Sequence, residues 1–374
     1  MSETLKRTQL YQWHVDNGGR MVPFAGYEMP VQFPTGPVFE HEVSRTVAGL
    51  FDIDHMGQME VRGPDAEAFV NHMVTYDVTK MKLLDAHYAL FCYADGGCVD
   101  DLFVYKLPDP GTGGFYFFIA INASNREKDV AWAKQHARGF DVSIKDISEE
   151  TYMIAFQGPK APEIMNRLTN VDLNQVARFT AAQDTILDGV PLLLGRTGYT
   201  GEDGFELFFP AEQAVKVWTA ILQAGEADGV KPIGLAARDS LRFEACMPLY
   251  GHEINAEISP VSAGLNFALS LDKEFIGRDA LLKQKLEKTG LVQVGFEMVE
   301  KGVAREHYTV LKDGQEVGFV SSGMFSPTTR KYLGMAYVPR ELAARDTEFE
   351  ILIRGKAVKA KVVKKPFYIP AYRR

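Results

Sequence analysis

The C-terminal region, from Leu291 onward, is the part of the sequence that most restricts how the chain can fold. Runs of β-favouring residues alternate there with turns such as Lys-Asp-Gly, Ser-Ser-Gly and Arg-Gly. Short strands joined by tight turns are typical of antiparallel barrels and sandwiches. We therefore expect a small antiparallel barrel that is entered through a charged helix at residues 281–288. Its predicted strands are residues 292–298, 308–312, 315–321, 334–338, 348–353 and 356–363.

In the preceding part of the chain, helical and strand patterns alternate irregularly, which favours an α+β fold. Because one hydrophobic core stops growing at roughly 250–300 residues, a chain of 374 residues should hold more than one packed unit. We expect residues 1–285 to form two α+β subdomains that can interleave, with a boundary near 147–160, and residues 286–374 to form the barrel domain. Predicted helices are residues 4–17, 38–49, 68–74, 125–138, 161–168, 211–225 and 235–245, and predicted strands are residues 50–61, 88–93, 99–106, 115–121, 142–147, 153–156, 185–187, 192–196 and 205–209.

Charge and composition argue against several classes of function. A formal net charge of −8 disfavours nucleic-acid binding, which needs a basic face. The charged N-terminus lacks the apolar core of a signal peptide and no apolar run is long enough to span a membrane, so we expect a cytoplasmic protein. The histidines are scattered, the three cysteines form no CxxC pair, and neither a P-loop nor a dinucleotide-binding glycine motif occurs. We expect no metal and no nucleotide, and we expect Cys92, Cys98 and Cys246 to be buried and reduced.

Asp100 and Asp101 form a pair of carboxylates inside the otherwise apolar strand 98–105. Because side chains alternate along a strand, one of the two should face inward and need hydrogen bonds or a shifted pKa. A carboxylate in a dry site can hold a cationic or proton-exchanging nitrogen. The alternative is that the inward aspartate only ties down a neighbouring loop, and the residues leave both possibilities open.

The segment Arg196–Glu206 is denser in glycine and polar residues than a plain hairpin requires. Glycine lets a backbone approach a ligand closely, while Tyr199 and Glu206 could stack on and hydrogen-bond a flat heterocycle. The alternative is an ordinary turn with an exposed glutamate.

Two groups of cations have simple default interpretations. Arg238 could bind a carboxylate, but its spacing to Arg242 on a predicted helix is typical of a solvated ladder of charges. The tail around 364–368, with Arg373 and Arg374 beyond it, is first interpreted as a solvated chain end.

Taken together, these segments resemble the aminomethyltransferase, or T-protein, family of the glycine cleavage system. The matching runs follow the family order through nearly the whole chain, and ten such runs in order are hard to obtain by chance. They are Phe24–Pro30, Gly49–Gly57, Gly96–Leu102, Asn122–Asp129, Phe156–Pro159, Arg196–Glu206, Ala237–Ala245, Leu249–Gly251, Ser322-Gly323 with Ser326-Pro327, and Lys364–Tyr368.

The resemblance implies a cloverleaf of three domains around a central channel that holds the co-substrate tetrahydrofolate, with the C-terminal barrel as one leaf. It also implies that Asp101 is the catalytic carboxylate beside the reactive folate nitrogens, and that Arg238 binds the glutamate tail. The implied partner is the lipoyl-carrying H-protein, and we expect a monomer or weak dimer. The remaining folate-binding positions implied by the resemblance are Met56, Tyr88, Tyr105, Asn122, Tyr199, Glu206 and Arg374.

The implied reaction moves a one-carbon unit from an aminomethyl-lipoyl group to tetrahydrofolate, with loss of ammonia, through iminium-like cations. A fixed carboxylate in a low-dielectric channel stabilises such cations. Asp101 is therefore expected to act as an electrostatic stabiliser and a candidate base.

Four positions depart from the family pattern and leave the one-carbon donor open. They are Asp54 for serine, His252 for glutamine, Tyr27 for tryptophan, and a Phe179-Thr180 region without the usual tyrosine. A sibling tetrahydrofolate-dependent demethylase of a small methylated amine, sulfonium or methoxy compound is one alternative. A non-catalytic iron-sulfur assembly factor is another, although residues 245–253 lack the Lys-Gly-Cys signature of that group. Five lysines could dock an acidic lipoyl protein or be solvated: Lys80, Lys82, Lys283, Lys285 and Lys288.

Overall fold

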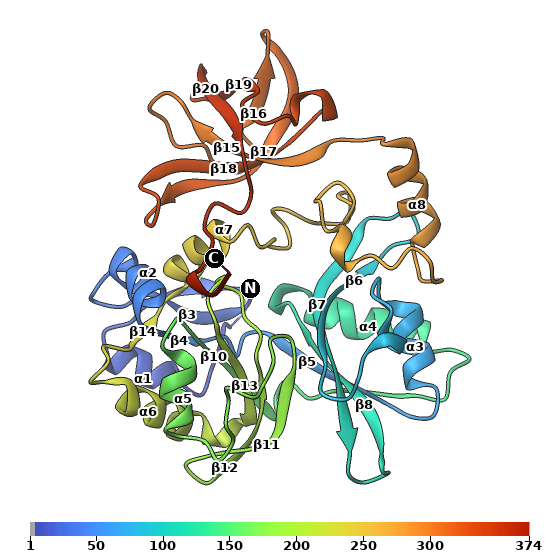
Figure 1. The fold of residues 1–374 in the computed structure, drawn as a ribbon, viewed down its shortest axis with the longest axis vertical. Coiled ribbons are helices and arrows are strands. Elements are labelled where there is room, and N and C mark those ends of the chain that lie inside the picture. Colours follow the sequence, from blue (N-terminus) through green and yellow to red (C-terminus); the bar gives the residue numbers. More distant parts are fainter. Residues whose placement is uncertain (1–3, 374) are drawn as a thin grey trace. The chain divides into compact units, whose positions relative to one another are not determined.

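The computed structural model describes residues 4–373. Within this part the chain forms two compact units (Figure 1). The first unit comprises the residues up to 73 together with 77–89 and 102–241. The second comprises residues 74–76 and 90–101 and the chain from 242 onward. The domain boundaries predicted near residues 147–160 and at 285/286 stay predictions.

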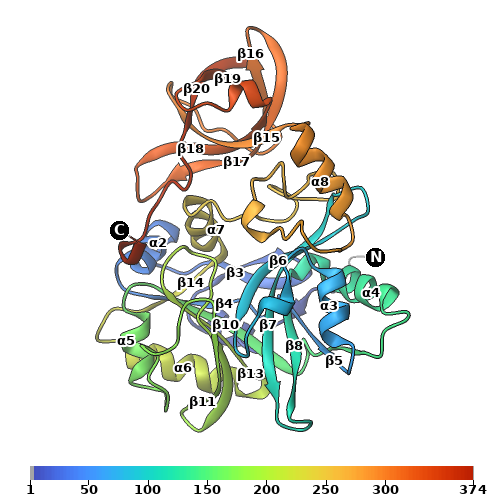
Figure 2. The same cartoon turned by 45° about the vertical axis from the view of Figure 1, so that its right-hand side comes forward.

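The first unit is built around a mixed six-stranded sheet. Its strands are antiparallel except for β14, which pairs with β4 in parallel. Helix α5 (Ala161–Asn166) packs against β13, and helix α6 (Ala214–Gly225) packs against β4 (Figure 2). Val217, Trp218 and Ile221 occupy one face of α6 and are fully buried, which is the spacing expected of an amphipathic helix. In sheet order the strands are β11 (Ala181–Leu187), β12 (Val190–Gly195), β13 (Gly204–Pro210), β10 (Thr151–Gln157), β4 (Gly49–Asp52) and β14 (Lys231–Ile233).

A second sheet, of five strands, carries several of the predicted site residues. Strand β8 is buried over most of its length, which explains its continuous apolar sequence. Helices α3 (Ala66–Met73) and α4 (Arg126–His136) contact this sheet. In sheet order its strands are β6 (Ala86–Cys92), β7 (Cys98–Asp109), β8 (Gly114–Ile121), β5 (Gly57–Arg62) and β9 (Ser143–Asp146).

A small three-stranded sheet and two short helices complete the first unit. The sheet has the order β1 (Lys6–Arg7), β3 (Tyr27–Gln32) and β2 (Arg20–Phe24). The helices are α1 (Tyr11–Asp16) and α2 (Pro37–Thr46), while α7 (Leu235–Glu244) continues into the second unit.

The second unit contains a closed six-stranded barrel that follows helix α8 (Arg278–Glu287). The ring closes because β15 pairs with both β18 and β20. Gly334 makes room for a core ring, since a Cβ at this position would lie 2.1 Å from Phe296 Cζ. The predicted α+β class and antiparallel C-terminal barrel are confirmed. In barrel order the strands are β15 (Val292–Met298), β18 (Lys331–Val338), β17 (Gln315–Ser326), β16 (Thr309–Lys312), β19 (Glu348–Ile353) and β20 (Lys356–Val363).

Three local predictions were wrong. The strand predicted at 50–61 is two strands, β4 and β5, separated by a turn at residues 53–56. The predicted helix at 4–17 is only the six-residue α1, preceded by β1. The hairpin of β2 and β3 was not predicted, and each of its strands contains a proline, a residue that is unfavourable inside a sheet.

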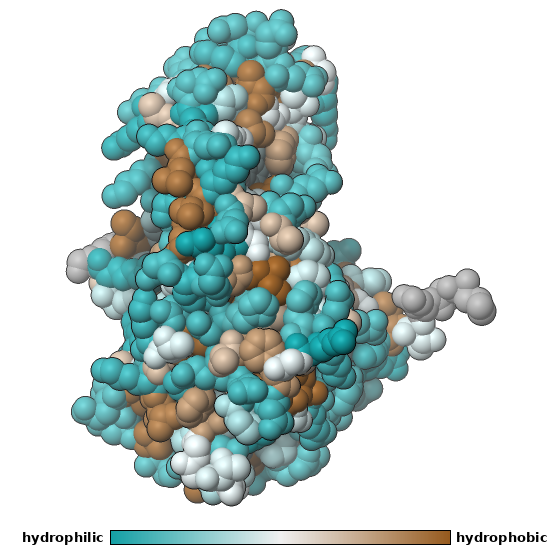
Figure 3. Space-filling view, turned by 90° about the vertical axis from the view of Figure 1, so that its right-hand side faces the viewer, coloured by the Kyte–Doolittle hydropathy of each residue, from teal (hydrophilic) through white to brown (hydrophobic). Residues whose placement is uncertain are grey.

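No helix among residues 4–373 is long and apolar enough to cross a membrane. On the face shown in Figure 3, hydrophilic residues cover most of the surface and hydrophobic residues form separate small groups.

Candidate functional site

The segment between β12 and β13 is a braced loop, so the alternative of an ordinary turn is wrong. The Gln157 side-chain amide donates hydrogen bonds to Thr197 O (3.0 Å) and Phe205 O (3.2 Å). A Cβ at Gly198 would lie 1.9 Å from Gln157 Oε1, so only glycine lets the loop approach this amide. The loop therefore holds its side chains on a fixed backbone.

Two ion pairs fasten the same loop to its surroundings. The Arg196 guanidinium contacts the Asp203 carboxylate at 2.7 Å, and the Arg45 guanidinium contacts Glu202 at 3.1 Å with both side chains nearly buried. Arg45 also donates to the carbonyl oxygen of Thr200 (2.7 Å). These charge-assisted bonds limit the freedom of the loop.

Tyr105, Thr197 and Glu206 form a hydrogen-bonded group at the start of β13. The Tyr105 hydroxyl lies 2.8 Å from Thr197 Oγ1, and Thr197 donates to Glu206 Oε2 at 2.5 Å. Gly195 is needed for this contact, because a Cβ there would lie 2.7 Å from the Tyr105 hydroxyl. Tyr105 is fully buried, whereas Glu206 is partly exposed.

The charge of Glu206 is set by its surroundings. Burial raises the pKa of Glu206, while the hydrogen bond from Thr197, the nearby Arg238 charge and the bond from Tyr105 oppose this, and the net pKa is raised. Burial and the Glu206 charge raise the pKa of Tyr105 well above its ordinary value, so its hydroxyl remains a neutral donor. Thr197 and Tyr105 therefore already donate hydrogen bonds to the Glu206 carboxylate.

Arg238 lies on α7 with its guanidinium carbon 4.7 Å from the centre of the Tyr199 ring. Both side chains are partly exposed. A guanidinium over an aromatic face is held there by a cation–π interaction. Tyr199 and Arg238 therefore lie together.

His55 was missed by sequence reasoning and lies close enough to Arg238 to sense its charge. Burial and the Arg238 charge lower the pKa of His55 to about 3, so the ring is neutral. It is 2% exposed, its edge meets the Phe24 ring, and its Nδ1 has no hydrogen-bond partner. The only sequence signal was its position directly before Met56.

Met56 and Asn122 occupy neighbouring ends of two paired strands. Gly57 at the start of β5 pairs with Ile121 at the end of β8, so the residues just beyond this pair lie at the same sheet edge. Both are partly exposed. Tyr88 on β6 is also partly exposed, and its ring lies 6.3 Å from the Phe103 ring.

Asp100 and Asp101 on β7 differ in burial. Asp100 has no exposed surface, whereas Asp101 is partly exposed. The prediction that one of the two faces inward is confirmed, and the inward residue is Asp100. Asp101 remains the carboxylate of this pair that a ligand can reach. Of the predicted site residues, Arg374 lies outside the described part of the chain.

Two default interpretations of charged residues were wrong. Arg242 is not part of a solvated ladder: it is 2% exposed, pairs with Glu253 at 2.7 Å and donates to Ser322 Oγ (3.3 Å). Lys365 is not a solvated tail residue, since it is only partly exposed, donates to Gln293 Oε1 and has a pKa lowered by burial. Lys365 and Gln293 are far apart in the sequence, as are Arg242 and Ser322, whereas Glu253 lies only 11 residues beyond Arg242.

Thr197 is a second residue that sequence reasoning missed. Its hydroxyl connects Tyr105 to Glu206, and the signal was its position inside the glycine-rich segment that was singled out. We predicted the tyrosine and the glutamate but not the side chain that joins them.

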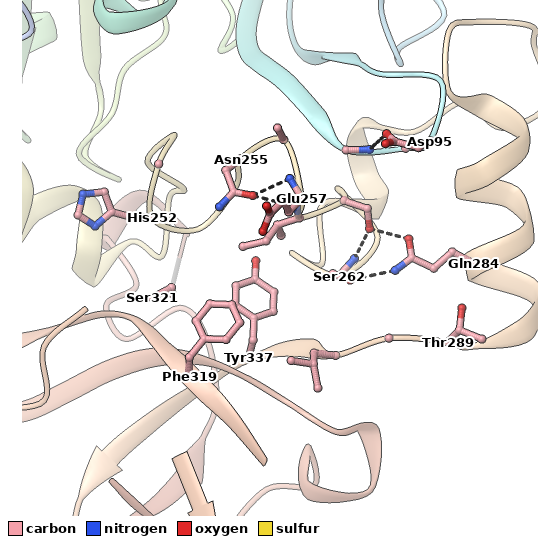
Figure 4. A pocket seen from close by; sticks show the side chains of 18 of the residues that line it. Asp95, His252, Asn255, Glu257, Ser262, Gln284, Thr289, Phe319, Ser321 and Tyr337 are labelled. Carbon is pink, nitrogen blue, oxygen red and sulfur yellow. Dashed lines mark hydrogen bonds between the residues drawn. The ribbon is translucent and has the colours of Figure 1, made fainter. Parts of the chain in front are cut away.

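The second unit contains a cavity of about 780 Å³, lined by both polar and apolar residues, that none of the predicted site residues lines (Figure 4). On its wall the His252 ring lies 3.2 Å from the Glu306 carboxylate. The stacked rings of Phe319 and Tyr337, 5.2 Å apart, form another part of the lining. Among residues 4–373 no group of three or more potential metal ligands occurs.

The fold and the site define a class of protein with an α+β N-terminal part, a carboxylate-bearing strand and a C-terminal antiparallel barrel. The family model described as "GCVT N-terminal domain" matches residues 10–273, and the one described as "Glycine cleavage T-protein C-terminal barrel domain" matches residues 292–368. The chain therefore belongs to the glycine cleavage T-protein family, and the resemblance seen in the sequence is confirmed.

Individual relatives match over their full length. The aminomethyltransferase of Alkaliphilus metalliredigens (strain QYMF) is 45% identical over 100% of both chains. That of Geobacillus kaustophilus (strain HTA426) is 48% identical over 97% of this chain and 99% of its own. The crystal structure of glycine cleavage system aminomethyltransferase T from Bartonella henselae is 30% identical, covers 99% of this chain and 100% of its own, and superposes with a TM-score of 0.91.

Proposed function

We propose that this chain is the aminomethyltransferase of a glycine cleavage system. It would transfer the one-carbon unit from the aminomethyl-lipoyl group of the H-protein to tetrahydrofolate. The products would be 5,10-methylene-tetrahydrofolate, ammonia and the dihydrolipoyl protein. The observation that carries the proposal is the full-length similarity to proteins named aminomethyltransferase, at 45–48% identity over 97–100% of the chain.

The side chains of the first unit suit tetrahydrofolate as co-substrate. Glu206 is oriented by Thr197 and can accept hydrogen bonds from the N–H groups of a pterin ring. The Tyr199 ring is a flat surface, and Arg238 beside it can bind a carboxylate of the glutamate tail. Met56, Asn122 and Tyr88 are the further residues that we assign to this co-substrate.

Asp101 is the residue that we assign to catalysis. When bound, tetrahydrofolate supplies the nitrogen that accepts the one-carbon unit. Loss of ammonia and transfer of that unit develop positive charge. A partly exposed carboxylate fixed on a strand stabilises this charge and can accept a proton from an amine nitrogen.

The proposed protein partner is the lipoyl H-protein. Helix α8 carries Lys283 and Lys285, with Lys288 at its C-terminal end, and these side chains can attract an acidic partner. Replacing the three lysines by glutamine should slow association most strongly at low salt, measured by stopped-flow mixing with the H-protein.

The test is a single-turnover transfer with purified protein, tetrahydrofolate and aminomethyl-loaded H-protein, following methylene-tetrahydrofolate and ammonia together. Formation of both products supports the proposal. Binding of tetrahydrofolate with neither product would contradict it. Methylated amines, sulfonium and methoxy compounds would then be tested as donors for methyl-tetrahydrofolate formation.

A further inference from the structure

The turn between β4 and β5, residues 53–56, contains Asp54 directly before the His55-Met56 pair. Asp54 is the second acidic residue of this segment, after Asp52 at the end of β4. Residues 53–56 form a tight turn in which Met56 N donates to Ile53 O at 3.0 Å. Asp54 fastens it to the neighbouring strand, because Met153 N on β10 donates to Asp54 Oδ1 at 3.0 Å. The position of Met56 therefore depends on the carboxyl group two residues before it.

Asp52, at the end of β4, is the ionised member of this acidic pair. Its carboxylate accepts hydrogen bonds from Thr8 (2.8 Å) and Tyr152 (3.1 Å), and lies 2.8 Å from His14 Nε2. Burial raises the pKa of Asp52, but the hydrogen bond and charge of His14 and the other donors outweigh it, and the net pKa is lowered. The fourth donor is the backbone N–H of Asp54, at 3.1 Å.

Asp54 lacks a comparable set of donors. Burial and the neighbouring Asp52 charge raise the pKa of Asp54 to about 9, and only the bond from Met153 opposes this strongly. Two adjacent carboxylates in a poorly solvated site do not both ionise readily, so one of them retains a proton.

Other charged groups around Asp54 do not supply a direct counter-ion at the turn. Arg126 on α4 is bound to Asp146 and Glu149, and Lys6 contacts the same Glu149. Glu149 itself raises the pKa of Asp54. Tyr27 on β3 also faces Asp54. Burial raises the pKa of Tyr27 and the charge of Lys6 opposes this, and the net pKa is raised.

We propose that Asp54 is a positioning residue for folate, which as a neutral carboxylic acid holds the turn that carries Met56. Loss of its proton to solvent places a second negative charge beside Asp52, repels the turn and displaces Met56. This inference rests on the proposed function, because Met56 is assigned there to tetrahydrofolate. It predicts that folate affinity falls at alkaline pH because Asp54 in this turn ionises.

The test is binding of 5-formyl-tetrahydrofolate, a stable analogue, by calorimetry from about pH 7 to about pH 10 in the full-length protein. The wild-type dissociation constant should rise by up to about tenfold between pH 7 and pH 10 as the proton leaves. The Asp54→Asn variant cannot ionise and keeps an acceptor for Met153 N, so its affinity should change much less over the same range. Asp54→Leu, which lacks the acceptor, should bind more weakly at every pH.

Two controls isolate the effect. Tyr27→Phe removes a tyrosine hydroxyl that faces Asp54, and it should keep the wild-type pH dependence. Asp184→Asn removes an exposed carboxylate on β11 and should also behave as wild type. Circular dichroism checks that each variant is folded over the pH range.

An infrared measurement tests the protonation state without folate. The carbonyl stretch of a protonated carboxylic acid should be present in the wild type at neutral pH and weaker in Asp54→Asn. Equal bands in both proteins, or equal pH dependence of binding in both, would overturn the inference and leave the proposed function intact. Failure of every variant to bind the folate at any pH would overturn the proposed function, and with it the role of Asp54 in folate binding.

Discussion

Arg238 and Arg242 lie one helical turn apart on α7, and the structure gives them different environments. Arg238 is partly exposed and lies over the Tyr199 ring at 4.7 Å. Arg242 is buried and forms an ion pair with Glu253 at 2.7 Å. Arg242 binds the protein itself, whereas Arg238 is the one that we propose to bind a ligand, although their spacing in the sequence is that of a simple charge ladder.

Asp100 and Asp101 show the same contrast on a strand. They are adjacent in the sequence, yet only Asp101 is exposed. On a helix the difference in burial arises between its faces. On a strand it arises because successive side chains point to opposite sides of the sheet. Similar neighbours therefore differ in function because one side of each element is buried.

Removing the buried Arg242–Glu253 ion pair should have the largest effect on stability. Arg242→Met leaves the Glu253 carboxylate buried without its cation, so the free energy of unfolding should fall by about 3–5 kcal/mol. Urea denaturation measures this, with Arg238→Met as the matched control, which should lose little stability. Equal losses in the two variants would contradict the comparison.

Asp101→Asn is nearly isosteric and removes the charge that stabilises the transferring cation. The single-turnover rate should fall by about 10²–10³-fold while the protein stays folded. Asp100→Asn is the control and should act on stability rather than directly on the chemical step. Transfer by the Asp101 variant at a near wild-type rate would refute its catalytic role.

Arg238→Met should weaken folate binding without unfolding the protein. A charge-assisted bond to a carboxylate contributes about 1.5–3 kcal/mol, which corresponds to a dissociation constant about 10- to 100-fold higher. Calorimetry is done with tetrahydrofolate and with an analogue that lacks the glutamate tail. The comparison separates a lost contact with the tail from a lost contact with the rest of the ligand. The variant should weaken the first ligand much more than the second.

The smallest effect concerns His55, whose pKa is lowered to about 3 by burial and by Arg238. The unfolded chain binds this proton below about pH 6.5 whereas the folded protein does not, so stability should fall as pH drops from 6.5 toward 3, by at most about 1.4 kcal/mol per pH unit. Denaturation at pH 7 and pH 5 measures the slope.

His55→Gln removes this titrating group and should give a shallower slope. Arg238→Met should raise the pKa of His55, so the loss of stability with falling pH should stop at a higher pH than in the wild type. An unchanged slope in His55→Gln would show that another group causes the acid sensitivity.

Most of the elements could be predicted from the sequence, because the hydrophobic pattern repeats with the period of the structure that each segment forms. The barrel strands and helices α3, α4 and α6 are examples. The strand at 50–61 was predicted as continuous because its apolar residues hide the turn at 53–56. The β2–β3 hairpin was missed because tertiary pairing tolerates the prolines in both strands.

The candidate site was predicted less evenly. The sequence singled out Tyr199 and Glu206 through segment 196–206 and Arg238 through its predicted helix, but it did not single out Thr197 or His55. Their importance follows from contacts with Tyr105 and Arg238, which lie far from them in the sequence. Pattern alone cannot show such contacts.

The sequence by itself determined the α+β class, the C-terminal barrel and the family, since these follow from local pattern and from motifs in order along the chain. Only the tertiary structure decided which aspartate is buried and which arginine is paired. It also showed that Asp54 lies beside an already ionised carboxylate. The physical reason is that burial and charge depend on neighbours from distant segments, and these neighbours are brought together only by folding.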